Sequence, residues 1–109
     1  MAVREVTAAQ VKAELDAGQV ALLLDVRENH EFVGELGHVA KAKLSPLGGL
    51  EAAIPTLLTF KDQNVVTVCK AGGRSSTAAA LLSAAGFSNV RSMAGGMLAW
   101  NAAGLPVER

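Results

Sequence analysis

Hydrophobic residues gather in short continuous runs along this chain rather than in long stretches. The runs VALLLDV (20–26) and VVTV (65–68) are typical of strands that are covered on both faces. Shorter segments at 4–6, 42–44 and 90–92 predict three more strands. The pattern therefore predicts a sheet of about five strands with two of them deeply buried.

The segments between these runs favour helices. Thr7 is a suitable N-cap for a helix over 8–17, in which Val11 and Leu15 share one face. Gly18 follows at the position where glycine commonly ends a helix. The sequence thus predicts a first helix between the first two strands.

Further helices are expected downstream of the second strand. Three of them lie at 29–33, at 75–85 before Gly86, and at 97–103. Another helix should follow a turn at Pro46, with Pro55 near its start or at a kink within it. Because helices alternate with strands, the crossovers should be right-handed and the sheet parallel. We expect an α/β fold: a three-layer sandwich with a small, mainly parallel sheet flanked by helices.

Composition and charge narrow the class of protein. The 109 residues suit one domain spanning 1–109. Ten basic and ten acidic residues cancel, so neither nucleic acid nor a membrane surface is expected as a partner. The N-terminal segment lacks the pattern of a secretory signal, no apolar run could span a bilayer, and the single cysteine can form no internal disulfide. We expect a cytoplasmic protein without a metal or cofactor.

The single cysteine, Cys69, directly follows the predicted strand 65–68. Ligands bind at the carboxyl ends of strands in open parallel sheets, and the next residues turn into a helix whose first amides lack helical partners. Gly72 and Gly73 remove side chains that would shield these amides, so N–H groups can point at the sulfur. Such surroundings lower a cysteine pKa from ~8.5 into roughly 3.5–7.5.

A lone cysteine is more often a small core residue, but three features favour a reactive thiol here. These are the position at a strand tip, the paired glycines and the flanking cations Lys70 and Arg74. Lys70 either is simply solvated or helps to recognise an anionic ligand. Arg74 either contacts that ligand or holds the loop through hydrogen bonds to carbonyl groups.

Four motifs in the chain resemble those of rhodanese-like sulfurtransferases. The segment CKAGGRS with the alanine-rich helix after it resembles the active-site loop of that family, with Cys69 as the sulfur-carrying nucleophile. LLLDVRENHEF, GELGHVAKAKLSPL and SMAGGMLAWNAAGLPV are similar to three other family segments, in the family's order. The second of these departs from the family pattern, because Ala40 and Lys41 replace a proline and a glycine.

The resemblance implies a ping-pong transfer of sulfur. A small anionic donor such as thiosulfate would place its outer sulfur on Cys69, and cyanide, a small thiol or a sulfur-relay protein would remove it. The active-site loop would comprise Lys70, Ala71, Gly72, Gly73, Arg74 and Ser75, with the amides of 71–75 holding the terminal sulfur. The small chain should leave the thiol loop accessible to a protein partner.

Three other polar residues, Asp25, Arg27 and His38, are expected to support the structure rather than to take part in catalysis. Asp25 and Arg27 end the apolar strand 20–26, where a partly buried hydrogen-bonded pair is favoured over catalysis. His38 lies in a glycine-rich turn, which indicates a hydrogen-bonded structural histidine rather than a base.

Two other classes of function compete with sulfur transfer. Cell-cycle dual-specificity phosphatases have a similar fold, but they place five residues between cysteine and arginine. Only four residues separate Cys69 from Arg74, and this shorter ring should suit sulfur better than the phosphate or arsenate of a phosphatase or arsenate reductase. The second alternative is a non-catalytic binding or regulatory module, in which the cysteine is often lost.

Overall fold

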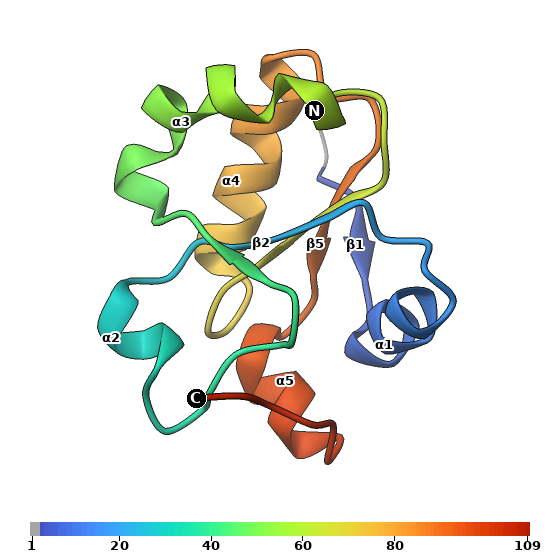
Figure 1. The fold of residues 1–109 in the computed structure, drawn as a ribbon, viewed down its shortest axis with the longest axis vertical. Helices are drawn as coiled ribbons and strands as arrows, with labels where there is room; N and C mark the ends of the chain where they lie inside the picture. Colours follow the sequence, from blue (N-terminus) through green and yellow to red (C-terminus); the bar gives the residue numbers. More distant parts are fainter. Residues whose placement is uncertain (1–2) are drawn as a thin grey trace.

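The fold is an α/β sandwich built on five parallel strands. A computed structural model describes residues 3–109. The strands pair in the order β1-β5-β4-β2-β3, and every pairing is parallel (Figure 1). Their bounds are β1 Glu5–Val6, β2 Leu22–Asp25, β3 Lys43–Leu44, β4 Val65–Val68 and β5 Val90–Met93. The predicted five-stranded parallel sheet is confirmed.

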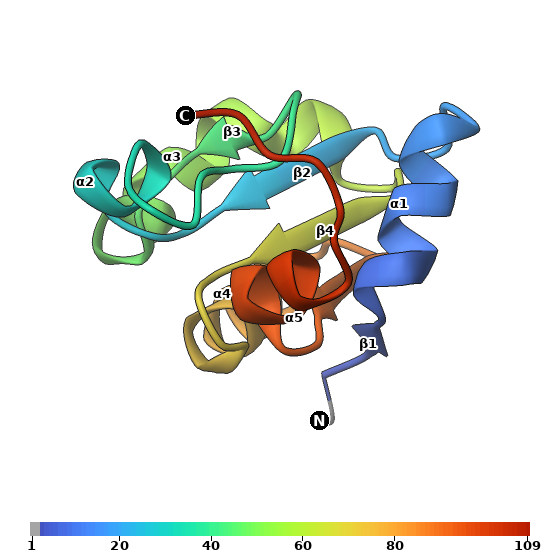
Figure 2. The same cartoon turned by 90° about the horizontal axis from the view of Figure 1, so that it is seen from below.

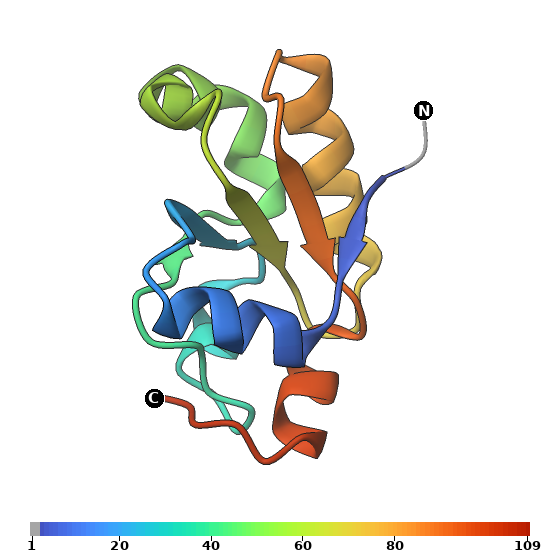
Figure 3. The same cartoon turned by 90° about the vertical axis from the view of Figure 1, so that its right-hand side faces the viewer.

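Helices cover both faces of this sheet and form the two outer layers (Figure 3). They are α1 Ala8–Asp16, α2 Asn29–Phe32, α3 Leu50–Leu57, α4 Gly73–Ala84 and α5 Gly96–Ala102, with 3-10 turns at Leu47–Gly49 and Leu58–Phe60. Side chains alternate along β2, so that Leu22 and Leu24 pack under α3 and α4 while Leu23 packs under α1 and α5. The expected three-layer sandwich follows from this alternation.

Local signals account for most helix ends. Thr7 caps α1 as expected, because its hydroxyl accepts the Gln10 amide at 3.1 Å and the Gln10 side chain accepts the Thr7 amide at 3.1 Å. One prediction of detail was wrong, because α4 begins at Gly73, two residues before the predicted Ser75. Of the two places expected for Pro55, the structure has the one within the helix, because Pro55 lies inside α3 and not near its start.

The turn after His38 carries the only non-glycine residue with a positive φ among residues 3–109. Lys41 has φ 71°, a left-handed conformation that suits the glycine of the family pattern better than a side chain. The C-terminal segment runs beside this turn (Figure 2), and Glu108 forms an antiparallel bridge with His38. The backbone therefore keeps a glycine-like turn despite the substitution.

The strand order places a topological switch point at the centre of the sheet. β2 and β4 are neighbours, but the chain leads from β2 to β3 on one side and from β4 to β5 on the other. Ligands bind at such a switch point, outside the carboxyl ends of the strands. Asp25 and Cys69 lie at these two ends. Within residues 3–109, no helix is both long and apolar enough to cross a membrane.

Candidate functional site

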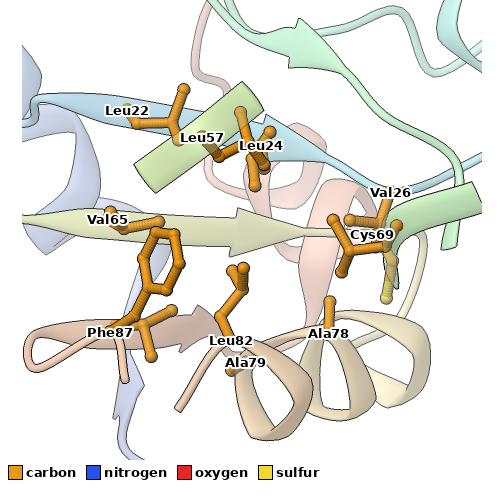
Figure 4. Packing of buried hydrophobic residues seen from close by; sticks show 12 residues of the cluster. Leu22, Leu24, Val26, Leu57, Val65, Cys69, Ala78, Ala79, Leu82 and Phe87 are labelled. Atoms are coloured by element: carbon orange, nitrogen blue, oxygen red, sulfur yellow. The ribbon is translucent and has the colours of Figure 1, made fainter. Parts of the chain in front are cut away.

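Cys69 lies beneath an exposed loop at the end of β4. The side chain belongs to the apolar cluster under α3 and α4, with its sulfur at one end of that cluster (Figure 4). Lys70, Ala71 and Gly73 are exposed, whereas Cys69 is only 1% exposed. The expected accessible loop is present, but the thiol itself is buried because the loop folds over it.

Hydrogen-bond donors surround the sulfur. The amide of Gly72 donates to Cys69 Sγ at 3.0 Å, and the hydroxyl of Ser75 lies 3.4 Å from the sulfur. Burial raises the pKa of the Cys69 thiol, but the Ser75 hydroxyl and the amides of Ser75, Gly72 and Ala71 outweigh it and lower the pKa overall. These hydrogen bonds therefore favour the thiolate of Cys69 more than water favours that of a free cysteine.

The first turn of α4 supplies these donors. Gly72 is the N-cap of the helix and has φ 112°, a conformation that glycine adopts without strain. The following twelve-residue helix directs its free amides and the positive end of its dipole toward Cys69. The loop and the helix thus act together on the same sulfur atom.

The start of α5 fixes the other side of the loop. The amides of Met97 and Leu98 donate to the carbonyl groups of Cys69 and Lys70 at 2.8 and 3.0 Å. A Cβ on Gly96 would lie 2.3 Å from the Cys69 carbonyl oxygen, so only glycine permits this approach. Sequence reasoning had placed Gly96 only within a family-like motif, because nothing local indicates a contact with Cys69.

Two buried serines lie behind the sulfur. Ser75 Oγ and Ser92 Oγ are 2.7 Å apart, and both residues are fully buried. Thr67 donates to the Ser75 carbonyl at 2.8 Å and anchors the helix turn that carries this hydroxyl. Ser92 comes from β5, and a single hydroxyl residue in a strand gave no sequence signal for this role.

Within residues 3–109, Arg74 binds a carboxylate rather than the loop carbonyl groups, and its contact with an anionic ligand stays a prediction. Its guanidinium binds the carboxylate of Glu31 on α2 through two hydrogen bonds of 2.7 and 2.9 Å. The Arg74 hydrogen bond is the main cause that lowers the pKa of Glu31 to about 2, and the same bond raises the pKa of Arg74. Lys70 is exposed and lines a cleft of about 250 Å³ that Glu31 also lines.

The segment from the end of β2 to His38 (residues 25–38) lies beside the Cys69 loop and is held by buried polar contacts. Asp25 and Arg27 are each 1% exposed and joined at 2.7 Å, a deeper burial than expected. Arg27 also donates to the carbonyl groups of Glu31 and Gly37 at 3.2 and 2.8 Å, which ties α2 and the next turn to β2.

The His38 ring belongs to the same segment. It stacks on Phe32 with 3.7 Å between the ring centroids, and its Nδ1 lies 2.8 Å from the Phe32 carbonyl oxygen. These contacts are of the kind that a structural histidine makes. Over residues 3–109, no group of three or more His, Cys, Asp or Glu side chains could hold a metal ion.

Comparison with protein families and known sequences places this site in context. The family model of the rhodanese-like domain matches residues 7–103. An uncharacterised protein of Synechocystis is 37% identical over 93 residues, which cover 85% of this chain and 50% of that protein. Two relatives match along most of their length.

The first of these two relatives is YtwF of Bacillus subtilis, named provisionally as a sulfurtransferase. It is 34% identical over 100 residues, covering 92% of both chains. The second is a sulfurtransferase of Allochromatium vinosum, which is 30% identical over 105 residues and covers 96% of this chain and 94% of its own. Relatives of nearly the same extent therefore carry the name of sulfurtransferases.

Solved structures give the same fold under two functional names. A rhodanese-related protein of Thermoplasma volcanium superposes with a TM-score of 0.83 at 28% identity, covering 94% of this chain and 95% of its own. A Rhodopseudomonas palustris protein of unknown function, named as a candidate tyrosine phosphatase, gives a TM-score of 0.84 at 28% identity, with 97% and 85% covered.

Proposed function

Because this chain belongs to the rhodanese-like domain family, we propose that it is a sulfurtransferase in which Cys69 carries sulfur as a persulfide. The observation that carries the proposal is the hydrogen bond from the Gly72 amide to Cys69 Sγ at 3.0 Å, at the N-terminus of α4. A donor there stabilises a thiolate before reaction and an anionic persulfide after it.

The first half-reaction loads the sulfur. The Cys69 thiolate attacks the outer sulfur of thiosulfate, the sulfur–sulfur bond of the donor breaks, and sulfite leaves with the bonding pair. One negative charge remains on the outer sulfur of the new persulfide. The amides of Ala71, Gly72 and Ser75 face Cys69 and are the groups to stabilise it.

The second half-reaction returns the free enzyme. A nucleophile such as cyanide or a small thiolate attacks the outer sulfur and leaves the Cys69 thiolate behind. That outer sulfur extends about 2 Å beyond Sγ, which brings it closer to the exposed loop than the buried thiol is. A sulfur-relay protein could present its own thiolate at the same loop, where Lys70 and Ala71 are exposed.

A phosphatase remains the alternative to test, because the Rhodopseudomonas palustris structural neighbour carries that name. Such an enzyme needs an arginine that is free to bind a phosphate dianion. Arg74 is instead bound through both terminal nitrogens to Glu31, and the four-residue gap after Cys69 makes a small ring. Both observations favour sulfur over phosphate.

Intact-protein mass spectrometry tests the proposal. The reduced protein treated with thiosulfate should gain about 32 Da, dithiothreitol should remove this mass, and Cys69→Ser should gain nothing. In parallel, the native protein should not hydrolyse an aryl phosphate above background. Absence of the mass gain at saturating thiosulfate, together with aryl phosphate hydrolysis that requires Cys69, would replace the sulfurtransferase with a phosphatase.

A further inference from the structure

The Glu31 carboxylate is fixed from two sides next to the Cys69 loop. Arg74 binds both of its oxygens at 2.7 and 2.9 Å, and the Glu28 amide donates to Oε1 at 3.0 Å. A bidentate pair of this kind is among the stronger hydrogen-bonded contacts in proteins, and the cap on α2 holds the carboxylate in place for it. Glu31 is therefore a preorganised partner for Arg74.

Because Arg74 is paired with Glu31, its positive charge is neutralised beside the Cys69 loop. Arg74 lies close enough to Cys69 for the thiolate charge to contribute to its raised pKa, after the larger effect of Glu31. The charge of Arg27 is likewise neutralised by the buried carboxylate of Asp25. Lys70 has no ion-pair partner within residues 3–109, and its charge is the same in the wild type and in the variants tested below.

We propose that Glu31 sets the donor preference of this site by occupying Arg74, an inference that rests on the proposed sulfur transfer. A dianionic donor such as thiosulfate must compete with Glu31 for the guanidinium. The persulfide group of a small thiol carries a single negative charge, located on the sulfur that the loop amides stabilise, and needs no second cation. The preferred donors are therefore persulfides of small thiols, whose reacting group is a monoanion.

The loading step with such a donor balances in the same way as with thiosulfate. The Cys69 thiolate attacks the outer sulfur of the donor persulfide, and the bond between the two donor sulfurs breaks. The donor thiolate leaves with the bonding pair, and the negative charge of the persulfide now lies on Cys69. No oxidant or reductant is needed.

Glu31→Gln tests this proposal, with Glu35→Gln as the matched control. Both variants remove one negative charge from the same cleft, but only the first releases Arg74. Glutamine also keeps an oxygen that can accept the Glu28 amide. In Glu31→Gln, the KM for thiosulfate should fall about tenfold, kcat and the KM for cysteine persulfide should change less than about twofold, and Glu35→Gln should match the wild type.

Alkylation of Cys69 gives a readout that does not depend on sulfur transfer. The ratio of the rates with iodoacetate, an anion, and iodoacetamide, which is neutral, should rise about tenfold in Glu31→Gln and return to the wild-type value in Glu31→Gln/Arg74→Met. An unchanged ratio, or an equal rise in Glu35→Gln, would overturn the role of Glu31. A rise in the ratio without sulfur transfer from either donor would uphold that role and overturn the proposed function instead.

Discussion

The loops after β2 and β4 start side by side and use their polar groups in opposite ways. Asp25 and Val68 are register partners at the ends of the two strands. After β2, all three nitrogens of the Arg27 guanidinium donate to Asp25 or to a carbonyl group. After β4, the Gly72 amide is directed at a sulfur atom.

This difference separates a supporting segment from a reactive one. A buried ion pair whose hydrogen bonds are all made has no capacity left for a ligand, so the loop after β2 stabilises geometry. Amides that face a thiol instead change its acidity, so the loop after β4 changes chemistry. The two loops should therefore respond differently to mutation.

The largest effect is expected from Arg27→Met. The change leaves the Asp25 carboxylate buried without a counter-ion and with only the backbone amide of residue 27 as a hydrogen-bond donor, which should lower the free energy of unfolding by about 3–5 kcal/mol. Urea denaturation followed by circular dichroism measures the loss. The double variant Asp25→Leu/Arg27→Met should recover part of it, because no buried charge remains. Equal stability of the single variant and the wild type would contradict the supporting role.

Ser92→Ala should act on the reactive loop without a large loss of stability. The Ser75 hydroxyl has one proton, for which the Cys69 thiolate at 3.4 Å and the Gly72 carbonyl at 3.2 Å compete. A hydrogen bond donated by Ser92 to Ser75 Oγ keeps Ser92 from becoming a third acceptor of that proton. Removal of the Ser92 hydroxyl should raise the pKa of Cys69 and slow its alkylation by iodoacetamide at neutral pH roughly three- to fivefold.

The pH dependence of alkylation distinguishes this effect from general damage. In Ser92→Ala the rate profile should shift to higher pH and reach the wild-type rate in alkaline solution. Ser88→Ala, which removes an exposed hydroxyl bonded to Asp62, serves as the control and should leave the profile unchanged. A uniform rate loss at every pH would mean that Ser92 only supports packing.

Short-range features of the site could be predicted from the sequence, and long-range features could not. The strand at 65–68, the position of Cys69 directly after it and the cap at Thr7 depend on neighbours along the chain. The early start of α4 was missed because Gly73 reads as a helix breaker in isolation.

The contacts of Glu31 and Gly96 join distant segments that no local pattern connects. Glu31 meets Arg74 across 43 residues, and Gly96 touches the Cys69 carbonyl through a packing contact between α5 and the loop. The burial of Cys69 has the same origin, because it depends on how the loop folds in space. Tertiary packing, rather than propensity, decides these features.

Acid titration provides a finer test of the contact between the two loops. Glu31 has a pKa of about 2, lowered from 4.5 chiefly by Arg74, so its stabilising effect is complete above pH 4.5 and disappears as the pH falls through 2. The stability difference between the wild type and Glu31→Gln should follow this course. At neutral pH it should stay below about 1 kcal/mol, because the pair is partly exposed.

Denaturant unfolding between pH 7 and 2 measures this difference. The Glu35→Gln variant, which lacks an ion pair to lose, should show no such convergence with the wild type at low pH. A difference that persists unchanged at pH 2 would assign the stability of Glu31 to packing rather than charge.

The smallest expected effect concerns Lys41, in the turn that follows the supporting segment. Its φ of 71° costs about 1 kcal/mol for a side-chain residue, and the extra entropy of glycine in the unfolded chain offsets about half of this. Lys41→Gly should therefore raise the free energy of unfolding by about 0.5 kcal/mol. Lys43→Gly in β3 should lower it. A loss in Lys41→Gly would mean that the lysine side chain stabilises the turn.

The hydrogen bonds by which α5 fixes the Cys69 loop have a consequence for protein synthesis. Cys69 emerges from the ribosome before Gly96 and Leu98, whose contacts fix the loop carbonyl groups. We therefore expect the thiol of a nascent chain to keep ordinary reactivity until the C-terminal helix has emerged. Released chains truncated before Gly95 should be alkylated with the pH profile of a free cysteine, and chains that include α5 should not. Maturation of the nucleophile would thus be tied to completion of the fold.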